Sequence, residues 1–401
     1  MNKKHFLIIA ILFVISLIYS KLLVTLSMLM FMVLAILKAI KNRDSIKGIL
    51  TSKAYIGLLF VFLAIVVSGI NSYNIEEWLV QLKMKLPFLF LPISFYIFGK
   101  IDRKTHFWIH AAFMAILVVS SFSVFSNYFQ NSDSINKAFY KGKSMPLPID
   151  HIHYAIMIAY AVTVSLLFSL SAKITTHKAI IFVIGAYLFL FVHFIAVRSG
   201  IVLSYIGIAT VMIHYLYKYG TIKQGLFTLA IMLLFPFVAY KTVPSLNHKI
   251  GYMLYDIEQY ANDRGNNFSD SERLMSYEIA IDLIKEKPLM GHGIGDLREI
   301  MIAKHQQKYG DKQKYINPHN QYLYIIVSIG FIGGILFFYG LLAPMIYLRK
   351  KNVFLVSLYI LLMVSFLVEN TIQRAVITAF FLFFILLNMG LEKKTISINK
   401  D

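Results

Sequence analysis

Three short stretches lie close together in the longest polar segment of this chain: Ser269-Asp-Ser-Glu-Arg273, Pro288-Leu-Met-Gly-His-Gly-Ile-Gly295 and Asn317-Pro-His-Asn-Gln-Tyr322. They fall between Lys241 and Tyr322, whereas most of the remaining sequence consists of long apolar runs. We therefore expect membrane helices on both sides to hold this polar segment against a bilayer surface, and we expect the chemistry of the protein to take place there.

The composition of the 401 residues excludes an ordinary soluble domain. Hydrophobic residues make up 58% of the chain and charged residues only 15%, with a mean hydropathy of +0.68, whereas soluble domains carry roughly 25% charged residues. Cysteine is absent, so the sequence offers no disulfide framework, no cysteine-based metal site and no thiol nucleophile. We predict an all-α polytopic membrane protein forming one integrated unit, with membrane helices in 1–241, a catalytic loop in 242–319 and further membrane helices in 320–401.

Apolar runs of about 18 residues or more predict membrane spans. We expect these spans to be helices, because a helix pairs all its backbone N–H and carbonyl groups internally where no water is present. The first run, Phe6 to Tyr19, lacks a small-residue cleavage site and is interpreted as an uncleaved span rather than a signal peptide. Twelve spans are predicted: 6–20, 22–40, 54–70, 86–99, 106–126, 152–171, 178–197, 199–217, 225–241, 320–348, 353–371 and 374–391.

The net charge of +19 suggests nucleic acid at first, but the distribution of the charge favours a topology signal. With both termini in the cytoplasm, the inner segments hold twenty Lys and Arg against four Asp and Glu. Residues 242–319 hold ten basic and eleven acidic residues and fall outside. This is the excess of positive charge expected on the inner side of a membrane, so we predict no nucleic acid partner.

Short motifs predict local structure on the outer side. Residues 71–85 are interpreted as an interfacial amphipathic stretch. Ser269 and Glu272 have the spacing of a capping box at a helix start, and a second loop helix is expected to end near Gly310. The glycines of Gly291-His-Gly-Ile-Gly295 indicate a tight turn that allows close backbone approach. Asn317 is expected to cap the tenth span.

Arg198 and Arg273 are candidate ligands for an anion. Arg198 lies in Val197-Arg-Ser-Gly200, where the seventh and eighth predicted spans meet on the outer side. Its planar guanidinium suits a bidentate grip on phosphate or pyrophosphate, although an arginine reaching for lipid headgroups explains its position equally well. Arg273 lies in the first turn of a predicted helix, where the dipole disfavours a cation. A bound anion would explain an arginine at this position, and so would exposure of its side chain to solvent.

His319 is the candidate general base. A position near a helix N-terminus favours the neutral imidazole, which can accept a proton; a role in capping or in headgroup contact remains an alternative. We identify no second carboxylate beside it. Two further histidines, His153 and His292, and also Asn320 are candidates for contacts with an acceptor or within the loop. Asp150-x-x-His153 does not indicate a metal, because His151 and His153 point to different faces of a helix.

The order of these motifs resembles the O-antigen ligase and O-antigen polymerase superfamily of inner-membrane glycosyltransferases. The resemblance rests on Arg198-Ser-Gly200, on Arg273 in the loop helix, on 288–295 and on His319-Asn320. It implies a twelve-helix fold without metal or other cofactor. Arg198 and Arg273 would bind the pyrophosphate of the donor and His319 would activate the acceptor. The family often carries tryptophan a few residues after the loop arginine, where this chain has Tyr277.

For function, the resemblance implies transfer of a glycan from undecaprenyl pyrophosphate to a hydroxyl of the lipid A core, with inversion, on the periplasmic face of the bacterial inner membrane. The implied partners are this lipid-linked donor, the lipid A core or another glycan acceptor, and membrane lipids. A polymerase of the same superfamily, acting in O-antigen or exopolysaccharide synthesis, is the alternative. A transporter or flippase fits less well, because the chain shows no internal repeat.

Overall fold

The computed structural model describes residues 3–139, 142–170, 176–220, 222–262, 269–310, 316–348 and 352–392. Within these ranges the chain is helical, apart from turns and one isolated bridge between Ile101 and Leu391. The elements are α1 (Lys3–Tyr19), α2 (Lys21–Lys41), η1 (Arg43–Ser45), η2 (Ile49–Thr51), α3 (Lys53–Val67), η3 (Ser68–Asn71), α4 (Ile75–Lys85), α5 (Pro87–Phe98), α6 (Arg103–Gln130), α7 (Ser132–Phe139), α8 (His151–Ser169), α9 (Thr176–Phe194), α10 (Arg198–Tyr219), α11 (Ile222–Thr242), α12 (Pro244–Ala261), α13 (Ser269–Glu286), α14 (Leu297–Tyr309), α15 (Gln321–Tyr347), α16 (Val353–Ser365), η4 (Thr371–Gln373) and α17 (Ala375–Gly390).

The predicted class, an all-α polytopic membrane protein, is confirmed. Among the described residues, eight helices are long and apolar enough to cross a membrane, and three shorter apolar helices, 179–194, 353–365 and 375–390, accompany them. Each of the twelve predicted spans contains a helix of the structure. Large apolar side chains on α2 and α11, such as Leu22 (68% exposed) and Leu233 (69% exposed), face outward, as expected where hydrocarbon is the solvent.

The stretch 71–85, predicted to be interfacial and amphipathic, contains a helix that is continuous with the next one. Its helix α4 runs almost directly into α5 across Leu86, which has helical torsion angles, so that Ile75–Phe98 counts as one membrane-length segment. Lys85 at the junction is completely buried and donates hydrogen bonds to the carbonyl oxygen of Ile372 at 2.6 Å and to Gln373 Oε1 at 2.9 Å. A buried cation needs such partners, so this end of α4 packs against η4, and the interfacial position of the stretch stays a prediction.

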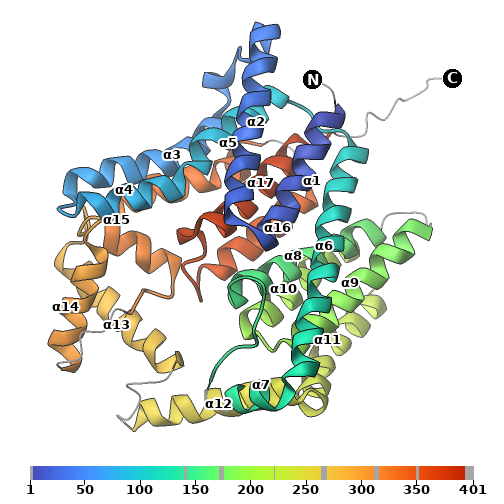
Figure 1. The fold of residues 1–401 in the computed structure, drawn as a ribbon, viewed down its shortest axis with the longest axis vertical. Coiled ribbons are helices and arrows are strands. Elements are labelled where there is room, and N and C mark those ends of the chain that lie inside the picture. The colour runs from blue at the N-terminus through green and yellow to red at the C-terminus, as the bar shows by residue number, and fades with distance from the viewer. Residues whose placement is uncertain are drawn as a thin grey trace.

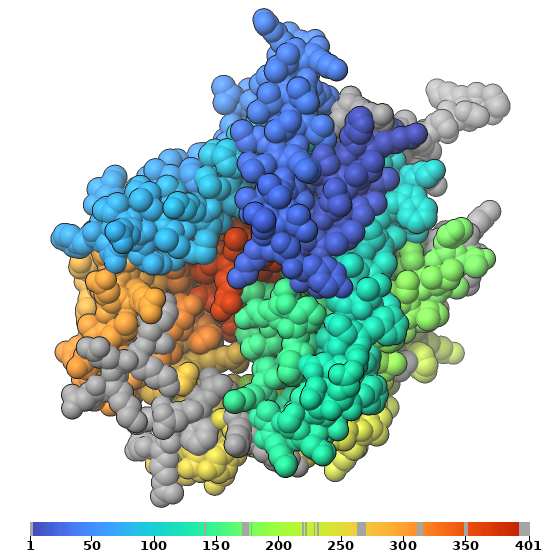
Figure 2. Space-filling model, viewed as in Figure 1, coloured from blue at the N-terminus to red at the C-terminus, as the bar shows by residue number. Residues whose placement is uncertain are grey.

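The helices form two flanks. Figure 1 shows α3, α4 and α15 side by side on one flank, while α6, α8, α9, α10 and α11 make up the other, with α12 and α7 lying across one end. Helices α16 and α17 lie between the flanks, and α17 is almost entirely buried. In Figure 2 the α1–α2 hairpin covers the upper middle of the visible face and lies beside α6.

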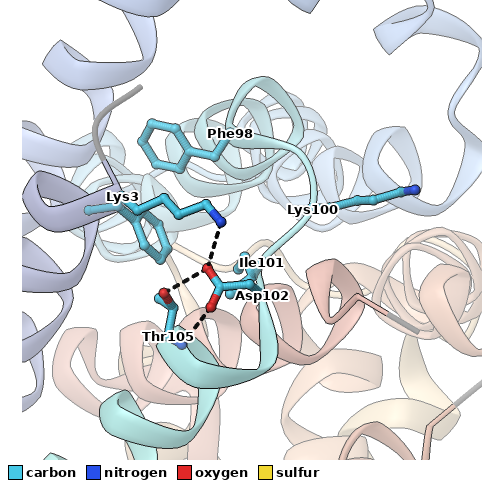
Figure 3. Close-up of a pocket in the computed structure, with 7 residues that line it drawn as sticks. Lys3, Phe98, Lys100, Ile101, Asp102 and Thr105 are labelled. Carbon is cyan, nitrogen blue, oxygen red and sulfur yellow. Dashed lines mark hydrogen bonds and ion pairs between the residues drawn. The ribbon is translucent and has the colours of Figure 1, made fainter. Parts of the chain in front are cut away.

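Both described ends of the chain meet at the opposite end of the molecule from α12. The N–H of Ile101 donates to Gly390 at 2.7 Å, and that of Glu392 donates to Ile101 at 2.8 Å. Figure 3 shows Lys3 reaching Asp102, a contact of 3.5 Å, while Asp102 caps α6 through Thr105. Both ends therefore lie on one side, which fits the even number of spans; which side faces the cytoplasm stays a prediction.

The tenth predicted span is a broken helix. At Gly330 the torsion angles φ 67° and ψ −176° leave the helical region, and the neighbouring backbone groups lose their intrahelical partners. Unpaired groups of this kind are costly at membrane depth. Four backbone hydrogen bonds with the segment 288–293 replace the lost ones. The N–H groups of His292 and Gly293 donate to the carbonyl oxygens of Val327 (2.9 Å) and Ser328 (2.8 Å). In the other direction, the N–H groups of Phe331 and Ile332 donate to the carbonyl oxygens of Pro288 (2.8 Å) and Leu289 (3.2 Å).

The glycines of this segment make the insertion possible. A Cβ on Gly291 would lie 2.5 Å from the nitrogen of Gly330, and one on Gly293 would lie 2.3 Å from the carbonyl oxygen of Asn71. The next residue after the turn, Asp296, accepts hydrogen bonds from the N–H groups of Tyr73 (2.8 Å) and Asn74 (2.7 Å). The predicted close backbone approach is thus confirmed, and it fastens the polar loop to α3, α4 and α15.

We predict that Gly330→Ala destabilises the protein, whereas Gly334→Ala in the same helix does not. At Gly330 a Cβ would lie 2.1 Å from the carbonyl oxygen of Leu289, and the backbone conformation there is one that only glycine adopts readily, a strain of about 1–3 kcal/mol before any clash. At Gly334 the nearest atoms are 3.8 Å away. Thermal unfolding midpoints in detergent measure both variants; equal midpoints would contradict the account of the break.

Candidate functional site

One pocket of about 430 Å³ collects the side chains to which the sequence pointed. It lies where the loop before α8, the α9–α10 turn, α12, the start of α13 and the loops before α15 and α17 converge. Arg198, Arg273 and His319, separated by up to 121 positions in the sequence, all line it. The other lining residues are Gly142, Lys143, Ser144, Asp150, His151, Ile152, Ile195, Ala196, Val197, Ser199, Lys249, Glu272, Glu369 and Arg374.

Arg198 is placed by a strained turn. Ala196 has a φ of +52°, a left-handed conformation that costs a residue with a side chain about 1–2 kcal/mol. This turn lets α10 begin at Arg198, and the cap residue Val197 provides no side-chain hydrogen bond. Since 195–199 all line the pocket, the N-terminal end of α10 borders it and adds its positive field to that of the guanidinium.

A single carboxylate orients both arginines. Asp270 accepts two hydrogen bonds from Arg198 Nη2, at 2.7 and 2.9 Å, and its Oδ1 lies 3.5 Å from Arg273 Nη1. The Asp270 side chain is 14% exposed, against 30% and 29% for the two arginines. The carboxylate therefore lies behind the arginines, which reach the pocket with part of their surface.

Asp270 is held in turn by α12. The buried carboxylate of Asp256 accepts hydrogen bonds from the N–H of Asp270 at 2.7 Å and of Ser271 at 3.2 Å, and it also contacts the Ser271 hydroxyl. It satisfies N–H groups at the start of α13 as a capping side chain would. The side chain of Ser269, from which a capping box was predicted, lies outside the described residues. α13 ends at Glu286, as predicted from Pro288.

His319 has a carboxylate partner that the sequence analysis missed. Its Nδ1 lies 3.4 Å from Glu369 Oε2. Burial raises the pKa of Glu369, but the hydrogen bond from His319 and the charges of His319 and Arg273 outweigh it and leave the pKa below its ordinary value. An ionised Glu369 favours the tautomer with the proton on Nδ1, which leaves the Nε2 lone pair of His319 able to accept a proton.

The loops carrying His319 and Glu369 are fastened to each other. The hydroxyl of Tyr277 donates to the carbonyl oxygens of His319 at 3.0 Å and of Leu367 at 3.3 Å. Asn320 Nδ2 also donates to Leu367, at 3.2 Å. Tyr277, which stands near the position where the resembling family often has tryptophan, therefore joins the two loops through its hydroxyl.

The remaining candidates have structural contacts. Asn320, not Asn317, is the N-cap of α15, since its side chain accepts from the N–H groups of Tyr322 and Leu323; His319 lies just before this cap. His292 is buried, with Nε2 2.9 Å from the carbonyl oxygen of Leu283. The expectation that Asn317 caps the span is therefore wrong, and His292 lies within the loop packing, away from the pocket.

His153 borders a second cavity of about 520 Å³, lined from the α1–α2 hairpin tip to the start of α17. The two cavities share Asp150 and Arg374, whose ion pair measures 3.4 Å. Asp150 also caps α8. Burial raises the pKa of Asp150, but the nearby charges of His153, His151 and Arg374 leave it below its ordinary value. A charged wall therefore separates two adjoining chambers.

The missed residues had weak signals in the sequence. Glu369 and Arg374 are the charged residues of the turn between the last two predicted spans, on the same side as the loop. Asp270 lies three positions before Arg273, one helical turn away. Only the pairing of Asp270 with Arg273 follows from this local spacing. The contacts of Asp270 with Arg198 and of Glu369 with His319 form only when the loops are folded together.

Residues 180–338 match the family described as O-antigen ligase, which confirms the resemblance over that segment. An uncharacterized protein of Haemophilus influenzae (strain ATCC 51907 / DSM 11121 / KW20 / Rd) is 30% identical over 159 residues, which are 38% of this chain and 40% of that protein. The match thus spans two fifths of the length of that relative. The family segment includes Arg198, Arg273 and His319 and ends before Glu369.

We predict that Asp256→Ala loosens the start of α13. Losing a capping carboxylate costs about 0.5–2 kcal/mol, so the amides of Asp270 and Ser271 should exchange hydrogen faster. Glu258→Ala, on the exposed face of the same helix, is the matched control and should leave them unchanged. Hydrogen–deuterium exchange of peptides covering 270–276 measures both, and unchanged protection in Asp256→Ala would contradict the assigned cap.

Proposed function

We propose that this chain is a membrane glycosyltransferase, because residues 180–338 match the family described as O-antigen ligase. It moves a glycan from undecaprenyl pyrophosphate to a hydroxyl of the lipid A core, on the periplasmic face of the inner membrane. The observation that carries the proposal is the pocket in which two arginines and a histidine–glutamate pair face the same space. Such a pocket combines binding of an anion with acceptance of a proton.

The arginines are assigned to the pyrophosphate of the donor. When the bond between the sugar and the pyrophosphate breaks, the electron pair moves to the leaving group and its negative charge grows. Arg198, Arg273 and the N-terminal end of α10 then stabilise the transition state more than the ground state. Asp270 prepares this arrangement, because it fixes the two guanidinium groups before the donor arrives.

His319 is assigned to the acceptor. Its Nε2 takes the proton of the acceptor hydroxyl while the hydroxyl oxygen bonds to the anomeric carbon of the sugar, on the side opposite the pyrophosphate. The bond to pyrophosphate breaks in the same displacement, so the anomeric centre is inverted. Glu369 holds the imidazole in the required tautomer and stabilises the imidazolium that forms. The proposed step needs no metal, because arginines supply the positive charge.

A polymerase of the same superfamily remains the second candidate. It uses a similar donor and base and differs in the acceptor, which is another lipid-linked glycan. The chamber of about 520 Å³ beyond Asp150 and Arg374 is large enough to admit part of a sugar acceptor, and its mixture of apolar and polar walls fits either acceptor. A transporter is less favoured, because the working charges gather in one pocket beside the loop rather than along a pathway.

We predict that His319→Ala lowers transfer by about 100- to 10,000-fold, the usual contribution of a general base, in cells that lack their own ligase. Polymer-bearing lipopolysaccharide and carrier-linked polymer measure the outcome. Full-length polymer retained on the carrier supports the ligase, and collapse to single repeat units identifies a polymerase. The exposed His177→Ala is the matched control. If His319→Ala inserts normally and changes neither glycan pool, the base is wrongly assigned.

We predict that Glu369→Gln lowers the turnover number by about 100-fold while Glu369→Asp retains more activity. Glutamine keeps the size of the side chain but removes the charge that fixes the tautomer of His319, so much of the contribution of the base is lost. The Michaelis constant for the donor should change little, since the arginines are untouched. Steady-state kinetics with purified enzyme separates the two constants; equal losses in both would indicate a general structural defect instead.

A further inference from the structure

Lys249 reaches the same pocket from α12. The side chain of Lys249 is half-buried. Its Nζ donates a hydrogen bond to the carbonyl oxygen of Gly142 at 2.7 Å, and the same Nζ lies 5.9 Å from the centre of the Phe139 ring. These contacts hold the ammonium group at the pocket wall near Arg198. One hydrogen bond to a carbonyl uses one of its three N–H groups, so two remain for a ligand.

The charges around the pocket leave Lys249 without a carboxylate. Five cationic side chains line the pocket, and three of them have an ion pair: Arg198 and Arg273 with Asp270, and Arg374 with Asp150. Of the other two, Lys143 is exposed to solvent. Among the described residues, no carboxylate lies within ion-pair distance of Lys249.

Burial lowers the pKa of Lys249 to about 8, and the charge of Arg198 acts in the same direction against a smaller opposing effect of Asp270. A half-buried ammonium group that faces a pocket and has no counter-charge is stabilised by an anion entering that pocket. Perturbed groups of this kind gather at sites of binding and catalysis. The hydrogen bond to Gly142 explains the position of the Lys249 side chain, but it does not neutralise the charge of the ammonium group.

We propose that Lys249 is a third cation for the donor, contacting one phosphate group of a glycosyl diphosphate whose other contacts are Arg198 and Arg273. The inference rests on the proposed function and extends it to the charge of the substrate. Three cations around two phosphate groups favour a diphosphate over a monophosphate. Because Lys249 is a lysine and not an arginine, the affinity of the site depends on pH.

The direction in which the affinity changes with pH depends on the charged groups around Lys249. The charges of Arg198 on α10 and of Asp270 on α13 act on Lys249, and the charge of Lys249 acts on His151 at the start of α8. Asp150 and Glu272 line the same pocket. Carboxylates and guanidinium groups in general titrate well outside the range from pH 7 to 9.5, and burial lowers the pKa of His151. Burial raises the pKa of the nearby Tyr252, so this phenol also stays neutral. As the pH rises through about 8, Lys249 loses its charge and the phosphate loses a partner.

The test is binding of farnesyl glucosyl diphosphate to the purified full chain in lipid nanodiscs, measured by calorimetry from pH 7 to 9.5. Both phosphates of this probe are esterified and stay fully ionised over that range, so a change in affinity reports the protein. The affinity of wild type for the probe should fall about tenfold from pH 7 to 9.5, and that of Lys249→Arg should fall little.

Lys249→Met should bind the probe about tenfold more weakly than wild type at pH 7, and its affinity should not change with pH. This is the effect expected for the loss of one charge-assisted hydrogen bond.

The controls separate the inference from the proposed function. Lys285→Met removes an exposed lysine of α13 and should match wild type. If wild type does not bind the probe at any pH, the proposed donor site itself fails. If wild type binds and Lys249→Met binds equally well, the site stands and the role of Lys249 is refuted. If Lys249 only holds Gly142 in place, both Lys249→Met and Lys249→Arg should bind the probe more weakly, and the pH profile of Lys249→Arg should match that of wild type. That result would also refute the proposed role of Lys249.

Discussion

Backbone N–H and carbonyl groups inside a membrane must find partners, and the break of α15 at Gly330 leaves several of them without any within the helix. The segment 288–293 provides the replacements, so the polar loop is built into the membrane part of the fold rather than attached to its surface. Glycines at 291 and 293 permit the approach, and Asp296 extends the contact to the turn before α4. A loop fastened in this way can hold side chains in fixed positions.

The pocket depends on that fixation. α13 leads directly into the anchored segment 288–293, Asp256 caps its first turn, and Asp270 orients Arg198 and Arg273. On the opposite wall, Tyr277 joins the loops of His319 and Glu369. Each of these carboxylates therefore has a partner that holds it in place, which is how charges are tolerated beside a membrane. The positive charge left over at Lys249 faces the cavity.

Much of the fold was predictable from local signals. Apolar runs identify membrane helices because burial in lipid depends on composition and length alone, and each predicted span contains a helix. Arg198, Arg273 and His319 were recognisable because unusual residues stand at predicted helix ends. The partners Glu369, Asp270, Asp256 and Lys249 were not, since each acts across 14 to 107 positions of sequence through a contact formed only in the folded chain. The cap predicted at Asn317 failed for a local reason, because Asn320 caps α15 instead. Asp256 holds the start of α13 from another helix, which no local pattern predicts.

The central claim is that the pocket between α10, α12, α13 and the loops before α15 and α17 binds the pyrophosphate of a lipid-linked glycan. The most direct measurement is a structure of the full chain in nanodiscs with farnesyl glucosyl diphosphate. The account predicts density for two phosphates against Arg198 and Arg273, with the sugar toward His319. Phosphates found elsewhere, for example at the opposite end beside Lys3 and Lys100, would contradict it.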